Sequence, residues 1–296
     1  MNTTTELFQQ HRGLMFSVAY QMLGSAADAE DVVQETWLRW ANVNPETVTQ
    51  PKAYLVRIAT NTALNRLRAA KNRRESYVGP WLPEPLETGP DAAQPVEMAE
   101  SVSLAMLVVL ETLTVDERAV FVLREVFGYP HAQIAQMLGR HESDVRQLAH
   151  RARSHVQARR PRFQADHDLH KQLTDRFISA AMTGDLEQIV ALLAPDVVLS
   201  TDGGGRVRAA RRPIHGADKV GRWFAGIAGR TWQGVSPSQL EYSATYLNGV
   251  YSLVAYYQET PVSTVTVDIA DHAISAIHVI ANPDKLRRLR PKPEPR

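Results

Sequence analysis

The chain of 296 residues contains no cysteine, so disulfide bonds and thiolate metal sites are excluded. Long hydrophobic runs are also missing: the longest, LAMLVVL at residues 104–110, is far too short to span a bilayer. The first twenty residues carry Glu6 and Arg12 where a secretory signal would need an apolar stretch. These absences predict a cytoplasmic protein without membrane attachment.

A net charge of only +1 conceals blocks of charge of one sign. Residues 28–35 are acidic, residues 51–75 are strongly basic, residues 76–100 are acidic, and basic residues return at 140–162 and 285–296. Such alternation favours one surface for a protein partner and others for a polyanion.

The hydrophobic pattern divides the chain into three folded parts. Helical spacing extends over residues 1–75 and again over 101–162, separated by a proline-rich, acidic linker at 76–100. From residue 166 two helices, at 170–182 and 186–193, precede strand-like runs that include DVVLS, RVRAA and TVTVDI, with a hairpin signal at Asn248-Gly249 and a short helix at 217–228. We therefore expect two all-α domains and then an α+β domain with a mostly antiparallel sheet, at 166–286, followed by a basic tail, at 287–296.

The most specific local signal is PHAQIAQMLGRHESDVRQLAHRARSHV at residues 130–156. A short helix, a break at Gly139 and a second helix from about Glu142 are typical of a helix-turn-helix, whose second helix enters the major groove. A helical hairpin with a solvated basic face is the alternative. The side chains expected to face DNA, by base or phosphate contact, are Ser143, Asp144, Arg146, Gln147, Arg151 and Arg153.

A second basic helix is predicted at residues 53–74. Arg57, Asn61 and Asn65 recur every four residues and form one polar stripe, which suits nucleic-acid backbone and unstacked bases. On this evidence alone a solvated helix face explains the pattern equally well.

DAEDVVQETWLRW (28–40) with AYLVRIATNTALNRLR (53–68) resembles conserved region 2 of extracytoplasmic-function (ECF) RNA polymerase sigma factors, and GYPHAQIAQMLGRHESDVRQLAHRAR (128–153) resembles region 4. The resemblance implies promoter-specific transcription initiation, with core RNA polymerase and promoter DNA as partners and no enzymatic activity. It assigns polymerase binding to Asp31, Gln34, Glu35 and Leu38. It assigns the −10 element to Arg57, Asn61, Asn65, Arg68, Lys71 and Arg73, and the −35 element to the helix-turn-helix. An extended linker would reach ~75 Å, enough for both elements, which lie on the order of 70 Å apart.

The third domain resembles the SnoaL-like branch of the NTF2-like superfamily, a helix-covered curved sheet found as an extension in sigma factors of the sigma J type. Three landmarks carry the resemblance: WLPEP at 81–85, DGGGR at 202–206 and NPDKL at 282–286. It implies a regulatory contact between this domain and the rest of the chain, through Trp81, Leu82, Pro83, Asp202, Gly203, Gly204, Gly205, Arg206, Asn282, Pro283 and Asp284.

The three glycines of TDGGGRVRAARR (201–212) are not expected to bind a nucleotide. A phosphate-binding loop runs into a helix N-terminus, whereas here strand-like runs stand on both sides and no helix begins before about residue 217. We expect instead a tight turn with positive φ between two strands.

Other functions remain open at this stage. The third domain could be a small-molecule cyclase or isomerase, or a ligand sensor, fused to a DNA-binding module. Its candidate proton carriers are Asp202, His215, Asp268 and His278. A helix-turn-helix activator that never joins polymerase is a further alternative, but it would not need the acidic helix at 28–35. We expect no cofactor and no metal, and an unknown small ligand in the third domain stays open. The basic tail is expected to be a disordered end, or a further contact to nucleic acid or polymerase.

Overall fold

The computed structural model describes residues 3–88, 103–159, 167–231 and 234–292. The chain forms two compact units: residues 1–75 and 92–160 make the first, and residues 76–91 and 161–296 make the second. Residues 76–91, in the predicted linker, thus belong with the C-terminal unit. No helix of the described residues is long and apolar enough to cross a membrane.

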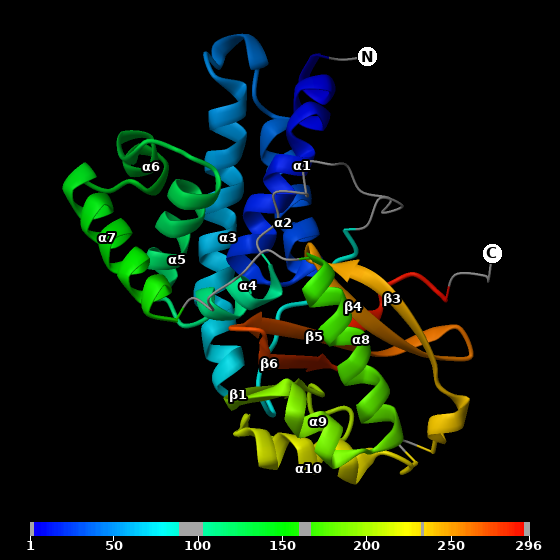
Figure 1. The fold of residues 1–296 in the computed structure, drawn as a ribbon. Helices are drawn as coiled ribbons and strands as arrows, with labels where there is room; N and C mark the ends of the chain where they lie inside the picture. The colour runs from blue at the N-terminus through cyan, green and yellow to red at the C-terminus, as the bar shows by residue number, and fades with distance from the viewer. Residues whose placement is uncertain (1–2, 89–102, 160–166, 232–233, 293–296) are drawn as a thin grey trace. The chain divides into compact units, whose positions relative to one another are not determined.

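The first half of unit 1 consists of three long helices that run side by side: α1 (Thr3–Leu23), α2 (Ala26–Trp40) and α3 (Pro51–Glu75) (Figure 1). A single 3-10 turn, η1 (Pro45–Thr47), lies in the loop before α3. Met15, Val18, Ala19 and Met22 recur at helical spacing and are fully buried, which explains how α1 packs against its neighbours. Ser25 caps α2 by accepting a hydrogen bond from the Asp28 amide.

The second half of unit 1 contains α4 (Leu104–Leu110), α5 (Val115–Phe121), a π-helical turn η3 (Val122–Val126), α6 (His131–Leu138) and α7 (Glu142–Arg159). Thr114 and Glu117 form a capping box at the start of α5. Gly139 ends α6 in the left-handed conformation, with φ of 63°, and lets the chain turn into α7. The predicted helix-turn-helix geometry is therefore present.

Unit 2 is α+β. The helices α8 (His167–Thr183), α9 (Leu186–Leu192) and α10 (Ala217–Ile227) accompany a six-stranded sheet of order β2-β1-β6-β5-β4-β3. The strands are β1 (Leu193–Asp202), β2 (Ile214–His215), β3 (Glu241–Leu247), β4 (Val250–Tyr257), β5 (Thr260–Ala270) and β6 (Ala273–Ile280). Among the strands of the described residues, only β1 and β6 pair in parallel. A 3-10 turn, η4 (Pro237–Gln239), precedes β3, and α11 (Pro283–Leu286) follows β6.

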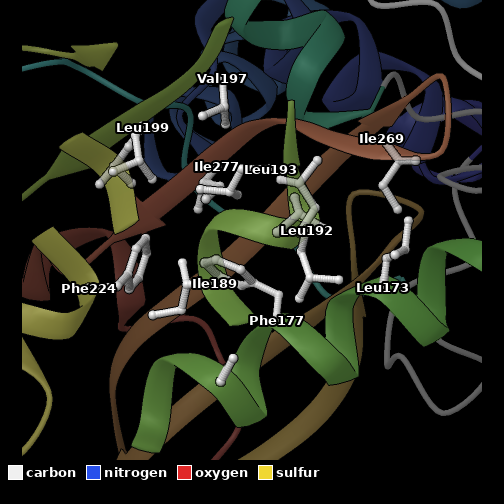
Figure 2. Packing of buried hydrophobic residues seen from close by; sticks show 14 residues of the cluster. Leu173, Phe177, Ile189, Leu192, Leu193, Val197, Leu199, Phe224, Ile269 and Ile277 are labelled. Carbon is white, nitrogen blue, oxygen red and sulfur yellow. The ribbon is translucent and has the colours of Figure 1, made fainter. Parts of the chain in front are cut away.

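The core of unit 2 lies between these helices and one face of the sheet (Figure 2). Phe177 of α8 and Phe224 of α10 meet edge to face, with ring centroids 4.9 Å apart. Ile189 of α9 and Leu199 and Ile277 of the sheet complete the contact and are fully buried. The predicted order of two all-α parts followed by a helix-covered α+β domain is confirmed.

Two local predictions are wrong. RVRAA at 206–210 is not a strand: the Arg206 and Val207 amides both donate to the Gly203 carbonyl, so the chain turns away from β1 instead of pairing with it. The tail is also not a disordered end as far as residue 292. Leu289 is buried, and the amides of Arg290 and Lys292 donate to the Glu87 carboxylate and the Glu259 carbonyl. Residues 293–296 lie outside the described part.

Candidate functional site

The helix α7 presents all six side chains predicted for the −35 element on its exposed surface: Ser143, Asp144, Arg146, Gln147, Arg151 and Arg153. Its opposite side, with Val145 and Leu148, is buried. Arg146 pairs with Glu142 at 2.6 Å and Arg153 with Glu125 at 2.7 Å. Exposed ion pairs are weak, so both arginines can exchange their carboxylate partners for DNA phosphates. The exposed face of α7 can therefore contact a DNA backbone.

The stripe predicted for the −10 element lies along one side of α3 and touches the second half of unit 1. Arg57 and Asn65 are exposed, but the Asn61 side-chain amide donates to the Met137 carbonyl at 3.0 Å. Arg68 pairs with Asp116 at 3.3 Å. Part of the stripe is therefore covered by α5 and α6 in this conformation. The side chains of Lys71 and Arg73, in the last turns of α3, lie outside the described part.

Asp116 bridges the two halves of unit 1, since it pairs with Arg140 at 2.5 Å as well as with Arg68. A deeper contact lies at Arg118, whose side chain is 2% exposed. Its guanidinium donates twice to the Gln21 carbonyl of α1, at 3.0 and 3.1 Å, and pairs with Glu111. Arg118 gives no signal of this role in the sequence, because an arginine within VDERAVF is typical of a helix surface.

A cavity of about 410 Å³ lies beside the start of α3. Its lining includes Gln50 from the loop before α3, Lys52 from the first turn of α3 and His11 from α1. Tyr129, just before α6, and Gln133 of α6 also line it. Burial raises the pKa of Tyr129. The cavity thus adjoins the start of α3, the helix whose residues are predicted to read the −10 element.

The acidic helix α2 exposes the side chains predicted to bind polymerase. Asp31, Gln34 and Leu38 are exposed and Glu35 is half-buried, which places the four on one side of the helix. Leu38 is 65% exposed, unusual for a leucine and suited to a protein partner. Arg66 of the neighbouring helix α3 lies 3.0 Å from Asp31 and helps to hold that carboxylate in place.

In unit 2 the landmark aspartate, Asp202, is fully buried at the end of β1 and organises a polar cluster. Its carboxylate accepts hydrogen bonds from Lys285 Nζ at 2.6 Å, the Leu82 amide at 2.8 Å and the Tyr77 hydroxyl at 2.6 Å. The Gly204 amide is a fourth donor, at 3.0 Å. Burial, and then the hydrogen bond to the Asp202 carboxylate, raise the pKa of Tyr77. Asp202 therefore joins three sequence segments far apart in the chain.

The segment 77–88, called the docked segment below, lies along unit 2. Leu82 is 2% exposed, and Lys285 Nζ lies 4.0 Å from the centre of the Trp81 ring. Further along, the Asn248 side chain accepts from the Leu86 amide at 3.1 Å. The Thr88 amide donates to the Tyr246 carbonyl at 2.9 Å. Docking of the Trp81-Leu82 pair thus accounts for apolar residues in a proline-rich stretch.

The glycine turn 203–205 belongs to the same cluster. Gly204 has φ of +60°, and a Cβ there would overlap the Asn282 amide. Asn282 in turn caps α11 through the Asp284 amide and donates to the Tyr77 hydroxyl. The turn needs glycine for a close approach, as well as for its backbone conformation.

Replacing Gly204 with alanine is expected to destabilise unit 2 by about 1–3 kcal/mol more than replacing Gly229. Both glycines have positive φ, but a Cβ at Gly229 meets nothing within 4 Å, so the difference isolates the overlap with Asn282. Urea unfolding followed by the fluorescence of unit 2 would measure it. Equal losses for the two variants would show that the close approach carries no free energy.

The four candidate proton carriers do not converge. Asp268 and His278 share a hydrogen bond of 2.9 Å and are buried, whereas Asp202 is engaged with Lys285. His215 is exposed on β2, with β1 and β6 between it and β5. In the described residues no three His, Asp or Glu side chains are placed to hold a metal ion.

Comparison with known proteins decides between these functions. Residues 7–73 match Sigma-70 region 2 and residues 103–156 match Sigma-70 region 4. The ECF RNA polymerase sigma factor SigJ of Mycobacterium tuberculosis is 40% identical over 290 residues, covering 95% of this chain and 91% of that protein. The chain belongs to the ECF RNA polymerase sigma factors.

The relation extends through the C-terminal unit. The crystal structure of M. tuberculosis SigJ superimposes with a TM-score of 0.76 and 34% identity, over 95% of this chain and 97% of that one. A probable ECF sigma factor of the same organism, SigI, is 30% identical over 96% of this chain and 94% of its own length. As an ECF sigma factor the chain directs transcription initiation and is not an enzyme; the catalytic alternative is not supported. Sigma factors bind core RNA polymerase and promoter DNA, which matches the two partners expected from the sequence.

Proposed function

We propose that the C-terminal unit restrains this sigma factor by binding the segment that connects its two promoter-reading regions. In this proposal α2 binds core polymerase through Asp31, Gln34, Glu35 and Leu38. The stripe on α3 reads the −10 element and the exposed side of α7 reads the −35 element. The contact between Asp202 and the docked segment regulates this activity. The protein acts in the cytoplasm, together with RNA polymerase.

The observation that supports restraint is the buried hydrogen-bonding of Asp202. One carboxylate holds the Leu82 amide and the Tyr77 hydroxyl, and Lys285 Nζ also donates to the Leu82 carbonyl. If the Leu82 backbone left this buried cluster, the polar groups of Asp202 and Lys285 would lose hydrogen-bond partners, which costs free energy. Docking is therefore a defined state rather than a loose contact.

Docking restricts the connection between regions 2 and 4. The predicted linker covers residues 76–100 and would reach ~75 Å when extended, at ~3.1 Å per residue. With residues 77–88 bound to unit 2, roughly half of the linker is held in one conformation and cannot adapt to the spacing of the promoter elements. Both promoter elements can then be reached together only after the docked segment is released.

Run-off transcription with purified core polymerase tests the restraint. The double variant Trp81→Ala/Leu82→Ala removes the apolar anchor of the docked segment and is expected to initiate several-fold faster than the wild-type chain. Leu186→Ala, a partly exposed leucine of the same unit, is the control and should leave the rate unchanged. Co-purification with core polymerase must be equal for all three chains.

An unchanged rate for the double variant, with its docked segment shown to be released by hydrogen exchange, would contradict the restraint. A chain ending at Arg160 gives a second comparison, because unit 1 has its own buried core. A small ligand for the C-terminal unit stays a prediction.

A further inference from the structure

The segment 206–212 of unit 2, called the arginine loop below, is strongly basic. Its sequence RVRAARR holds four arginines in seven residues, and no acidic residue occurs between Asp202 and Asp218. All four arginine side chains are exposed. Within the described parts of the chain, Arg211 and Arg212 have no carboxylate within ion-pair distance.

The backbone of the arginine loop is fixed to the sheet. The Ala210 amide donates to the Thr201 hydroxyl at 2.8 Å, and that hydroxyl donates to the Ala210 carbonyl at 3.2 Å. Thr201 is 2% exposed, so this anchor is shielded from water. At its other end the loop is held by the two amides that donate to Gly203. Guanidinium groups on a fixed backbone lose less conformational entropy when they bind a partner.

The charge of the loop continues onto the end of α11. Arg206 lies 3.3 Å from Asp284, and Arg287 lies 2.5 Å from the same carboxylate. The four exposed guanidinium groups of the loop are thus joined by that of Arg287, which meets Arg206 at the Asp284 carboxylate. Such a surface attracts a polyanion.

We propose that the arginine loop binds phosphates of duplex DNA, as a contact of the C-terminal unit that is independent of sequence. All four basic side chains of the loop are arginines, whose planar fork binds phosphate oxygens in pairs. The exposed side chains are these arginines, while Val207, Ala209 and Ala210 are half-buried, so the loop lacks the apolar anchor typical of a protein interface.

The phosphate-binding groups in this reading are the arginines and not the preceding glycines. The glycines turn against Asn282 and Val78 and leave no helix N-terminus for a phosphate. A sigma factor already brings its promoter duplex to the complex, and phosphate contacts add affinity and position without reading bases. The proposal goes beyond regulation by the docked segment and does not depend on it.

The test is the salt dependence of DNA binding by the full chain without polymerase. Fluorescence anisotropy with a labelled 30-base-pair duplex of arbitrary sequence, between about 50 and 200 mM salt, gives the slope of log K against log salt. The variant Arg208→Gln/Arg211→Gln/Arg212→Gln is expected to bind at least about tenfold more weakly at 100 mM salt. Its slope should fall by about 2–3, because each lost phosphate contact removes about 0.9.

The matched control is Arg176→Gln/Arg222→Gln/Arg230→Gln, which removes the same charge from exposed positions elsewhere in unit 2. It should keep the wild-type slope. Equal slopes for the loop variant and the wild-type chain, or equal losses in both variants, would overturn the proposal. It would also fall if the loop variant kept its DNA affinity but lost binding to core polymerase, since the surface would then serve an acidic protein. None of these results bears on the run-off comparison.

Discussion

Replacing Asp202 with alanine is expected to release residues 77–88 from the C-terminal unit. The carboxylate is fully buried and paired with Lys285, so its removal takes a negative charge away from a buried ammonium group. Breaking a buried pair in this way costs about 3–5 kcal/mol. The amide of Leu82 and the hydroxyl of Tyr77 lose their acceptor at the same time.

Hydrogen exchange at the Leu82 amide measures this release directly. A loss of about 3–5 kcal/mol corresponds to exchange that is faster by roughly 10² to 10⁴. Asp202→Asn, which keeps an acceptor oxygen, should show a smaller change. Asp284→Ala is the control, because Asp284 is 40% exposed and its ion pairs are worth at most about 1 kcal/mol.

An unchanged exchange rate of the Leu82 amide in the Asp202→Ala variant would mean that the docked segment is held by its apolar contacts alone. If instead Asp202→Ala released the segment and Asp202→Asn did not, hydrogen bonding rather than charge would be the cause of docking.

Asp202 and its partner Leu82 were both named from the sequence, but the partners Tyr77 and Lys285 were not. Tyr77 lies 125 residues away along the chain and Lys285 lies 83 away, and no local pattern couples positions at such separations. The residue types do not help, because a tyrosine at a helix end and a lysine in NPDKL both read as surface residues. Long-range partners of a buried charge become visible only when the fold brings them together.

Local signals predicted the helix-turn-helix well and the arginine loop badly. Gly139 and the apolar spacing of α6 and α7 act within a few residues, so the sequence contains the whole signal. In RVRAA the alternation of Val207 and Ala209 with arginines imitates a strand, because one side of the loop does rest on the protein. Whether an alternating segment is a strand depends on a pairing partner, and here the Gly203 carbonyl takes the amides that would have paired.

Replacing Arg118 with methionine is expected to loosen the contact between the two halves of unit 1. The guanidinium satisfies the Gln21 carbonyl with two donors and neutralises Glu111, and only 2% of the side chain is exposed. Methionine has a similar length but no donor, so a carbonyl and a carboxylate lose their partners, at a cost of about 3–5 kcal/mol. An equilibrium between closed and open arrangements of regions 2 and 4 would shift by roughly 10² to 10⁴.

The absence of cysteine makes this measurement simple, since two introduced cysteines are the only labelling sites. Dyes at Gln9→Cys in α1 and Gln157→Cys in α7, both exposed, report the distance between the two halves by energy transfer. Arg118→Met should lower the transfer efficiency, whereas Arg39→Met, which removes an exposed pair with Glu35, should not.

Opening of unit 1 has a consequence for DNA binding, because the closed arrangement occupies part of the α3 stripe. Asn61 is bound to the Met137 carbonyl and Arg68 to Asp116 as long as α3 contacts α5 and α6. If that contact competes with the promoter, Arg118→Met should also bind a −10 single strand more tightly than the wild-type chain does. Lower energy transfer without tighter binding would show that the closed arrangement leaves the reading surface accessible, and that Arg118 serves stability alone.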